Sequence, residues 1–178
     1  MLVMIGASAS GKTEIAKLLI KNYRFKKMVT YTTRPKREGE IDGVDYHFLS
    51  RESFEDKMRI DFFLETSCYN NHYYGTAFKD AALDKVLIVD IQGANALYKE
   101  LKDDVMIFFI QSPESLRKER MLARGDKLED VKKRLKIDKD YFVKENLDHI
   151  DYIINNAEHD LEEVTYNIYK TYKDTMLV

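Results

Sequence analysis

A glycine-bounded loop near the start of the chain constrains the fold more than any other stretch. It follows a short apolar run, LVMI at residues 2–5, and leads into a helical pattern that begins at Glu14. Its spacing is G-x-x-x-x-G-K-[ST], and its residues are Gly6, Ala7, Ser8, Ala9, Ser10, Gly11, Lys12 and Thr13. Strand, loop and helix in this order are typical of a phosphate-binding loop (P-loop), where backbone N–H groups and the helix dipole form an anion site. The correct flanks favour this interpretation over a serine-rich turn.

The residue types in the P-loop suit a nucleoside triphosphate. Gly6 and Gly11 let the backbone approach a phosphate without a Cβ atom in the way. Lys12 has the reach to contact the β- and γ-phosphates, and the Thr13 hydroxyl is placed to bind Mg²⁺. We therefore expect a nucleoside triphosphate site with Mg²⁺ as its cofactor.

Length, charge and cysteine content limit the class of protein. The chain has 178 residues, 44% of them hydrophobic, which is enough for one domain with a substantial core. Its net charge of −2 gives no global bias toward nucleic acid or an acidic membrane. A single cysteine, Cys68, excludes an intrachain disulfide and fits a reducing compartment. Because no apolar run approaches the ~20 residues of a membrane span and the start lacks a basic signal-peptide region, we expect a cytoplasmic protein without membrane or nucleic-acid partners.

Strand-like and helix-like segments alternate along the chain. Apolar or β-branched patterns predict strands over residues 26–33, 44–49, 62–66, 72–76, 85–90, 105–110 and 151–155. Helical patterns cover residues 50–60, 77–84, 113–145 and 158–173, besides the helix after the P-loop and one after residue 90. The alternation predicts an α/β core with a mainly parallel sheet flanked by helices, and residues 30–76 form a small extended subdomain inserted into it.

Several short motifs beyond the P-loop occur in an order and spacing that resemble guanylate kinases. They are Thr32-Thr33-Arg34-Pro35, Gly39-Glu40, Asp42-Gly43, Asp45-Tyr46, Tyr73-Tyr74-Gly75, Asp90-Ile91-Gln92-Gly93 and the set Arg120, Arg124-Gly125 and Arg134-Leu135. The resemblance runs nearly end to end and implies one domain of the P-loop NTPase fold. Its parts are a core (1–29, 77–112 and 146–178), a small α+β insertion that binds GMP (30–76) and a helical lid (about 113–145). It also implies ATP and GMP as substrates, with the γ-phosphoryl group of ATP transferred to GMP.

By resemblance, the insertion grips the phosphate of GMP and reads its base. Arg34 and Arg37 bind the phosphate, and the hydroxyls of Tyr46 and Tyr74 complete its coordination. Phosphate suits the fixed fork of arginine donors. The alternative for the two arginines is a solvated surface loop.

Guanine recognition is assigned in the same way to a carboxylate and two hydroxyls. Glu65 matches the N1–H and N2 amine of guanine, and Thr30 and Thr76 carry the hydroxyls. Adenine has a lone pair at N1, so a buried carboxylate disfavours it. Without the resemblance, Glu65 is equally well an outward-facing strand residue.

The resemblance also implies residues for the transferring phosphate and for ATP. The catalytic set consists of Lys12, Arg34, Arg120, Arg124 and Arg134, and most lysines of the basic lid segment are expected to be solvated. Asn155 stands where the family places a contact on the adenine side of ATP. The alternative is that Asn155 simply forms a turn. Two roles stay open for Asp90: contact with Mg²⁺ through a water molecule, and contact with the acceptor nucleotide.

The chain departs from the family pattern at three positions. Ile88 stands where a second acid is usual, which weakens any role that needs paired carboxylates beside Asp90. Ala9 replaces a common glycine of the P-loop, and Thr30 replaces a common serine.

Two rival functions use the same fold. A kinase of another phosphorylated acceptor, such as a ribose phosphate, would keep the P-loop but has no need of Glu65 and Thr76. A protein-binding scaffold without catalysis is the second rival, and the intact Lys12 and Thr13 count against it. Either a monomer or a homodimer fits the sequence.

Overall fold

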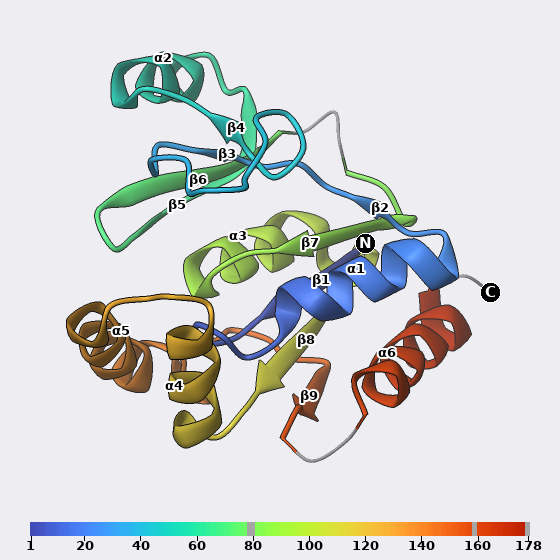
Figure 1. Cartoon of the computed structure of the whole chain (residues 1–178). Helices are drawn as coiled ribbons and strands as arrows, with labels where there is room; N and C mark the ends of the chain where they lie inside the picture. The colour runs from blue at the N-terminus through green and yellow to red at the C-terminus, as the bar shows by residue number, and fades with distance from the viewer. Residues whose placement is uncertain (78–80, 158–159, 177–178) are drawn as a thin grey trace.

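The protein is described here by a computed structural model that covers residues 1–77, 81–157 and 160–176. Figure 1 shows a central sheet with helices on its faces, a second small sheet at the top and a pair of helices at the lower left. The predicted α/β architecture with a mainly parallel core sheet is confirmed.

The core sheet contains five parallel strands in the order β2-β7-β1-β8-β9. The strands are β1 (Leu2–Ile5), β2 (Lys26–Lys27), β7 (Lys85–Ile88), β8 (Met106–Gln111) and β9 (Tyr152–Asn155). β1 lies in the middle and is buried along its whole length, as its uninterrupted apolar run requires. The P-loop therefore starts at the carboxyl end of the central strand.

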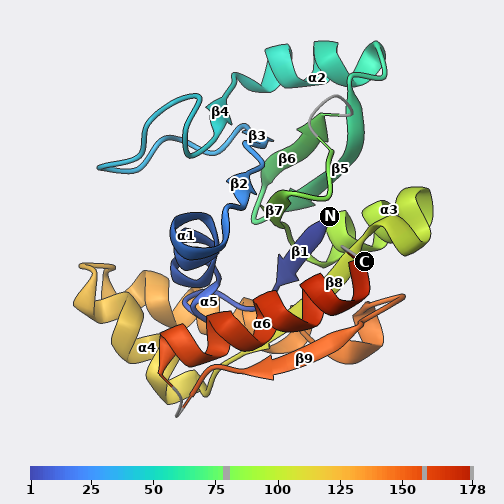
Figure 2. The ribbon, with the colours of Figure 1, turned by 90° about the vertical axis from the view of Figure 1, so that its right-hand side faces the viewer.

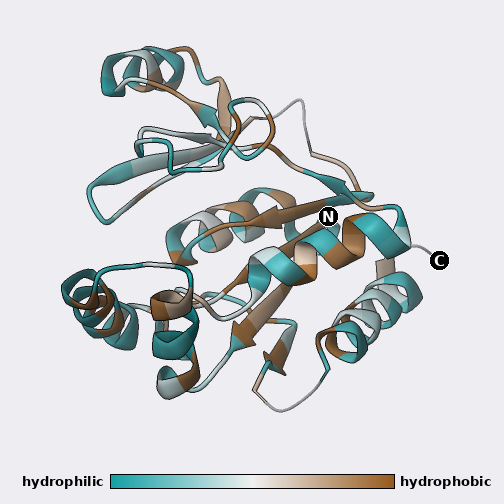
Figure 3. Cartoon of the chain, viewed as in Figure 1, coloured by the Kyte–Doolittle hydropathy of each residue, from teal (hydrophilic) through white to brown (hydrophobic). Residues whose placement is uncertain are grey.

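Each face of the core sheet is covered by helices. Side chains of β1 alternate between the two faces, so Leu2 and Met4 pack with α1 (Lys12–Tyr23) and α6 (Leu161–Met176). Val3 and Ile5 pack with α3 (Ile91–Leu101) on the other face. Figure 2 shows α6 running beside α1, and Figure 3 shows the hydrophobic strands between helices of mixed hydropathy.

The second sheet has four strands in the order β4-β3-β6-β5. They are β3 (Tyr31–Thr32), β4 (His47–Phe48), β5 (Phe63–Tyr69) and β6 (His72–Ala77), and α2 (Arg51–Arg59) packs beside them through Phe54. Asn70 and Asn71 form the β5–β6 turn, both with the positive φ that a tight hairpin turn demands. Ser50 caps α2, because it accepts the N–H of Ser53.

The segment after β8, predicted to be helical over residues 113–145, folds into two helices. These are α4 (Glu114–Ala123) and α5 (Leu128–Tyr141), followed by a short 3₁₀ turn at Lys144–Asn146, while another such turn, Lys102–Asp104, precedes β8. A small apolar cluster of Met121, Val131 and Leu135 joins α4 to α5, and Ala9 of the P-loop packs against it. The lid segment is thus attached to the phosphate-binding loop.

Three predicted elements differ from the structure. The strand over 26–33 is wrong as one unit, because β2 pairs with β7 in the core whereas β3 pairs with β4 and β6 in the second sheet. The strand predicted over 44–49 is reduced to β4. The helix over 77–84 is wrong at residues 81–84, which are turn or irregular, and residues 78–80 lie outside the described ones.

The last helix begins at Leu161, and residues 158–159 of its predicted range are also outside the described part. Within the described ranges, no helix combines the length and the apolarity needed to cross a lipid bilayer.

Candidate functional site

The P-loop has a backbone shape that only glycine fits at its two ends. Gly6 has φ of 145° and Gly11 has φ of 102°. A Cβ atom on Gly6 would lie 2.2 Å from the carbonyl oxygen of Ile110, and one on Gly11 would lie 2.1 Å from Nδ2 of Asn156. Ala9 adopts a φ of 60°, the left-handed region, which costs a non-glycine residue about 1–2 kcal/mol. Its methyl group packs against the lid cluster of Met121, Val131 and Leu135.

Side chains of the P-loop itself and of distant parts of the chain donate hydrogen bonds to the carbonyl groups of the P-loop. Lys12 Nζ donates to Gly6 O at 2.6 Å and to Ala7 O at 2.9 Å. Arg120 Nη1 donates to Ala9 O at 3.2 Å, and Asn156 Nδ2 donates to Ser10 O at 2.9 Å.

In contrast, the amides of Ala9, Gly11 and Lys12 find no acceptor in the described part of the chain. Backbone N–H groups oriented in this way at the start of a helix form an anion site.

The protonation of Lys12 depends on whether an anion is bound at the P-loop. Burial lowers its pKa to about 8, and the nearby Asp138 carboxylate opposes the shift while Arg117 and Arg124 add to it. A phosphate bound by the loop would favour the charged ammonium group, because an opposite charge favours the ionised form.

A cavity of about 430 Å³ opens beside the outer side of the P-loop. Its lining residues are Ala9, Ser10, Gly11, Lys12, Thr13, Glu14, Arg120, Arg124, Asn156 and Leu161. Asn155, the residue predicted for the adenine side, does not line it: Asn155 is exposed at the end of β9 and lines a separate depression. The buried neighbour Asn156 lines it instead, because successive residues of an extended chain point to opposite sides.

A second cavity, of about 210 Å³, extends from the P-loop to the second sheet. It joins residues of the P-loop, the second sheet, the end of β7 and the helical segment after β8, and its polar lining includes Ser8, Lys12, Thr13, Thr30, Arg37, Tyr46, Glu65, Ser67, Tyr69, Tyr74, Asp90, Arg124 and Arg134. Lys12 and Thr13 line both cavities, so an anion on the P-loop would lie where the two meet.

Glu65 contributes an unpartnered carboxylate oxygen to the second cavity. The residue is 5% exposed, and its Oε1 accepts a hydrogen bond from Thr76 Oγ1. Its Oε2 is buried and has no hydrogen-bond partner. Burial raises the pKa of Glu65 to about 7, the charge of Asp90 adds to that shift, and the Thr76 hydrogen bond opposes it. Thr76 itself does not line the cavity, so its hydroxyl orients Glu65 in this structure, whereas Thr30 does line it.

The predicted phosphate grip is assembled around Tyr46 and Tyr74. Both tyrosines and Arg37 line the second cavity. Arg34 lies one step away, in an adjoining cavity that also contains the other three residues. Its guanidinium group is paired with Glu40 at 2.6 Å and lies 5.3 Å from the ring centre of Tyr46. The four residues of the prediction are therefore brought together, and burial raises the pKa of both tyrosines, which keeps their hydroxyls protonated.

Asp90 closes β7 and faces the second cavity while capping α3. Its Oδ1 accepts the N–H of Gly93 at 2.8 Å, and its Oδ2 accepts the hydroxyl of Ser67 at 3.0 Å. Ile88, two residues earlier, lines the same cavity and contributes no second acid there.

The oxygen donors beside the P-loop fit a hard divalent cation. Thr13 is exposed at the junction of the two cavities, and Asp90 lies across the second one. Within the described ranges, no cluster of three or more His, Cys, Asp or Glu side chains has the arrangement of a metal cage. A site with one hydroxyl and one distant carboxylate suits Mg²⁺, which retains water molecules and binds substrate phosphates.

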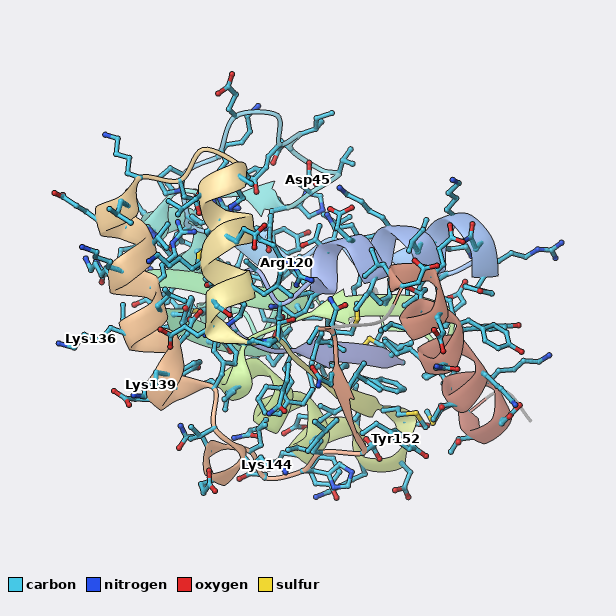
Figure 4. All side chains as sticks on the ribbon, turned by 60° about the horizontal axis from the view of Figure 1, so that its bottom comes forward. Asp45, Arg120, Lys136, Lys139, Lys144 and Tyr152 are labelled. Carbon is cyan, nitrogen blue, oxygen red and sulfur yellow. The ribbon has the colours of Figure 1, made fainter. Side chains whose placement is uncertain are left out.

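The lid places its arginines along both cavities. Arg120 extends from α4 toward the start of α1 (Figure 4) and also donates to Ser112 Oγ at 3.2 Å. Arg124 and Arg134 lie on either side of Asp126, which is paired with both. Lys136 and Lys139 extend away from the body of the molecule (Figure 4), as expected for solvated lysines.

Sequence reasoning missed four residues that this arrangement depends on: Tyr69, Arg117, Asp138 and Asn156. Arg117 and Asp138 form an ion pair of 3.1 Å with side-chain exposures of 8% and 0%. Asp138 follows Val131 and Leu135 at helical spacing, on the apolar face of α5. A charged residue on the apolar face of a predicted helix is a signal from which Asp138 could have been identified in the sequence.

Fold and site together define a P-loop nucleotide-binding protein with a second cavity between its P-loop and the second sheet. The family model for guanylate kinase matches residues 1–174 of the chain. The chain belongs to the guanylate kinase family.

Individual relatives agree with this assignment. The guanylate kinase of Clostridium tetani is 37% identical over 136 residues, which are 73% of this chain and 65% of that protein. The guanylate kinase of Mycoplasma genitalium is 35% identical over 171 residues, 89% of this chain and 69% of the other. The chain thus spans about two thirds of the length of the curated relatives it matches, and slightly less than that for Clostridium tetani.

Solved structures match the same fold. The crystal structure of guanylate kinase from Anaplasma phagocytophilum superposes with a TM-score of 0.77 at 25% identity, covering 100% of this chain and 86% of that one. A gluconokinase from Sinorhizobium meliloti has a TM-score of 0.56 at 13% identity, covering 97% of this chain and 91% of that one, which is a likeness of fold alone.

Proposed function

We propose that the chain transfers the γ-phosphoryl group of ATP to GMP, giving ADP and GDP. The observation that carries the proposal is the buried, unpartnered Oε2 of Glu65, which shares one cavity with Lys12 of the P-loop. A desolvated acceptor oxygen costs free energy unless a ligand donates to it. The N1–H and N2 amine of guanine are adjacent donors that one carboxylate can accept.

In this proposal residues 30–76 bind GMP and residues 113–145 form the lid. Arg34, Arg37, Tyr46 and Tyr74 hold the phosphate of GMP, and the P-loop amides and Lys12 hold the β- and γ-phosphates of ATP. Lys12, Arg37, Tyr46 and Tyr74 converge on one cavity and Arg34 lines the adjoining one, which supports an in-line approach of the two phosphates. The acceptor oxygen is already anionic, so no general base is needed.

The arginines of the lid would neutralise the charge that spreads over the moving phosphoryl group. Arg124 and Arg134 both line the cavity that holds Glu65, and Arg124 also lines the one beside the P-loop. Preorganised positive groups of this kind stabilise phosphoryl-transfer transition states. Closure of the lid excludes water, which would otherwise accept the phosphoryl group.

Mg²⁺ is the cofactor we propose, held by Thr13 and, through water, by Asp90. When bound, it would neutralise charge on the β- and γ-phosphates. We further propose that the protein acts in the cytoplasm as a monomer or homodimer, without nucleic-acid partners. The net charge of −2 supports the absence of nucleic-acid partners. The lone, exposed Cys68 supports a reducing compartment such as the cytoplasm.

The proposal is tested by measuring ADP release with ATP and a panel of acceptors: GMP, AMP, CMP, UMP and ribose phosphates. We expect turnover with GMP to exceed that with the other nucleotides by at least about a hundredfold, because the wrong base leaves Glu65 unpaired. Preference for a ribose phosphate would establish the rival kinase. No turnover with any acceptor, together with intact nucleotide binding, would establish a scaffold.

A further inference from the structure

Asp138 lies where the lid, the P-loop and the second sheet meet. Its Oδ2 accepts the N–H of Ser8 at 2.7 Å and Nη1 of Arg117 at 3.1 Å. Its Oδ1 accepts the hydroxyl of Tyr69 at 2.7 Å. Each donor comes from a different element: the P-loop, α4 and β5.

The carboxylate of Asp138 is fully enclosed, with 0% side-chain exposure. A buried charge is stable only when its partners satisfy it, and here three donors do so. Arg117 Nη1 also lies 3.4 Å from the carbonyl oxygen of Ser8. Both backbone groups of Ser8 are therefore held by lid side chains, which fixes the P-loop relative to the lid.

Tyr69 connects this junction to the second sheet. Within the described residues, its bond to Asp138 is the one hydrogen bond between residues 30–76 and residues 113–145. Its ring centre lies 5.4 Å from that of Tyr141 and 6.2 Å from that of Phe142 at the end of α5. Burial and the adjacent Asp138 carboxylate raise the pKa of Tyr69, so its hydroxyl stays protonated and can donate.

Glu65, Ser67 and Tyr69 alternate along β5 and share one face of the strand, because side chains of a strand repeat every second residue. All three line the second cavity. A base bound at Glu65 would fix the face of β5 that carries Tyr69. Tyr69 donates to Asp138, and Asp138 in turn accepts the N–H of Ser8 in the P-loop.

We propose that Tyr69 and Asp138 are positioning residues that couple the binding of the acceptor nucleotide to the binding of the nucleoside triphosphate. The inference rests on the proposed function, because it requires GMP at Glu65. GMP favours the arrangement of β5 in which Tyr69 reaches Asp138, and this arrangement holds the lid on the P-loop. The coupling is reciprocal: each nucleotide increases the affinity for the other by the same factor.

The test measures the dissociation constant of GMP by calorimetry, with and without saturating β,γ-methylene-ATP and Mg²⁺. The ratio of the two constants is the coupling factor. We expect a factor of about ten in the wild type, within the usual range for coupled sites, and about two in Tyr69→Phe. Tyr172→Phe is the matched control, because Tyr172 is also buried and its hydroxyl donates to Leu83 O at 2.8 Å, away from the site. Its factor should equal that of the wild type.

Asp138→Ala is a second variant, because it removes the acceptor that an asparagine would keep, and a double substitution completes the cycle. If the bond between the two residues carries the coupling, Tyr69→Phe should lower the factor no further in the Asp138→Ala background. The inference is overturned by a wild-type factor of one, by an unchanged factor in Tyr69→Phe, or by an equal loss in Tyr172→Phe. A wild type that binds the ATP analogue but not GMP would instead overturn the proposed function on which the inference rests.

Discussion

Asn156 donates a hydrogen bond to the carbonyl oxygen of Ser10 at 2.9 Å, joining the end of β9 to the P-loop across 146 positions of the chain. The side chain is 3% exposed and leaves no room for a Cβ atom on Gly11. Through this contact Asn156, and not Asn155, lines the cavity beside the P-loop.

We expect Asn156→Ala to raise the KM for ATP about tenfold, because the loss removes the shorter of the two hydrogen bonds to the Ser10 carbonyl oxygen and leaves only the one from Ser112 Oγ at 3.2 Å. Asn155→Ala is the matched control, since Asn155 is exposed, and its KM for ATP should stay within about twofold of the wild type. Steady-state kinetics at saturating GMP provide the measurement. The opposite order of effects would restore the original prediction for Asn155.

Gly11→Ala should weaken ATP binding because the added Cβ atom overlaps Asn156, an effect beyond the cost of its backbone conformation. Gly39→Ala separates the two effects, because Gly39 has φ of 81° but no atom within 4 Å of an added Cβ. We expect the Gly39 variant to lose about 1–2 kcal/mol of unfolding free energy and to keep its ATP affinity. The Gly11 variant should lose more stability and at least about tenfold in ATP affinity. Equal effects in urea unfolding and ATP titration would show that overlap with Asn156 is unimportant.

Lys12→Ala should lower turnover about 10³-fold while the fold is retained, because Lys12 is the ammonium group beside the phosphate-binding amides. Lys21→Ala, on the exposed last turn of α1, is the control and should leave turnover unchanged. Far-UV circular dichroism establishes that both variants fold. Near-normal turnover in Lys12→Ala would remove the central assignment of the P-loop.

GMP binding should weaken as the pH falls below about 7. The folded-state pKa of Glu65 is raised to about 7, so the empty site is protonated below that value and must release a proton to accept N1–H. The dissociation constant for GMP should then rise by up to about tenfold per pH unit between pH 7 and 5.5. For the same reason the protonated carboxyl group of Glu65 stabilises the folded state when the pH is below the pKa that the group has in the unfolded chain. This contribution to the free energy of unfolding is lost as the pH rises through about 7.

Glu65→Gln is the reference for this pH dependence, because the phosphate of GMP titrates in both proteins. The variant should bind GMP about a hundredfold more weakly than the wild type, keep its ATP affinity and lack the Glu65-dependent slope. Calorimetry in buffers of different ionisation enthalpy measures the released proton directly. An identical slope in both proteins, or an equal loss for ATP and GMP, would count against a guanine site at Glu65.

The local signals in the sequence predict the centre of the site well. The P-loop is specified by glycines whose backbone shape and close contacts no other residue can provide, and the hairpin turn by Asn70 and Asn71. Both features depend on the covalent geometry of a few consecutive residues, so a short motif is enough to identify them.

The remaining features depend on contacts between distant segments. To predict that Asn156 and not Asn155 faces the cavity, one must know the residue at which β9 ends. A shift of one position reverses the direction of the side chain. The break between β2 and β3 arises because the two pieces pair with different sheets, which residues 26–33 do not encode locally. The bond between Tyr69 and Asp138 spans 69 positions and has no motif.

The carbonyl groups of the P-loop are held by Arg120 and Asn156, which enter the chain more than a hundred positions after the loop itself. During synthesis the loop therefore leaves the ribosome long before the residues that donate to its carbonyl groups. A nascent chain that stops short of β9 contains the complete nucleotide motif and cannot yet form the site. Capture of ATP by the growing polypeptide should appear only after residue 156 has emerged.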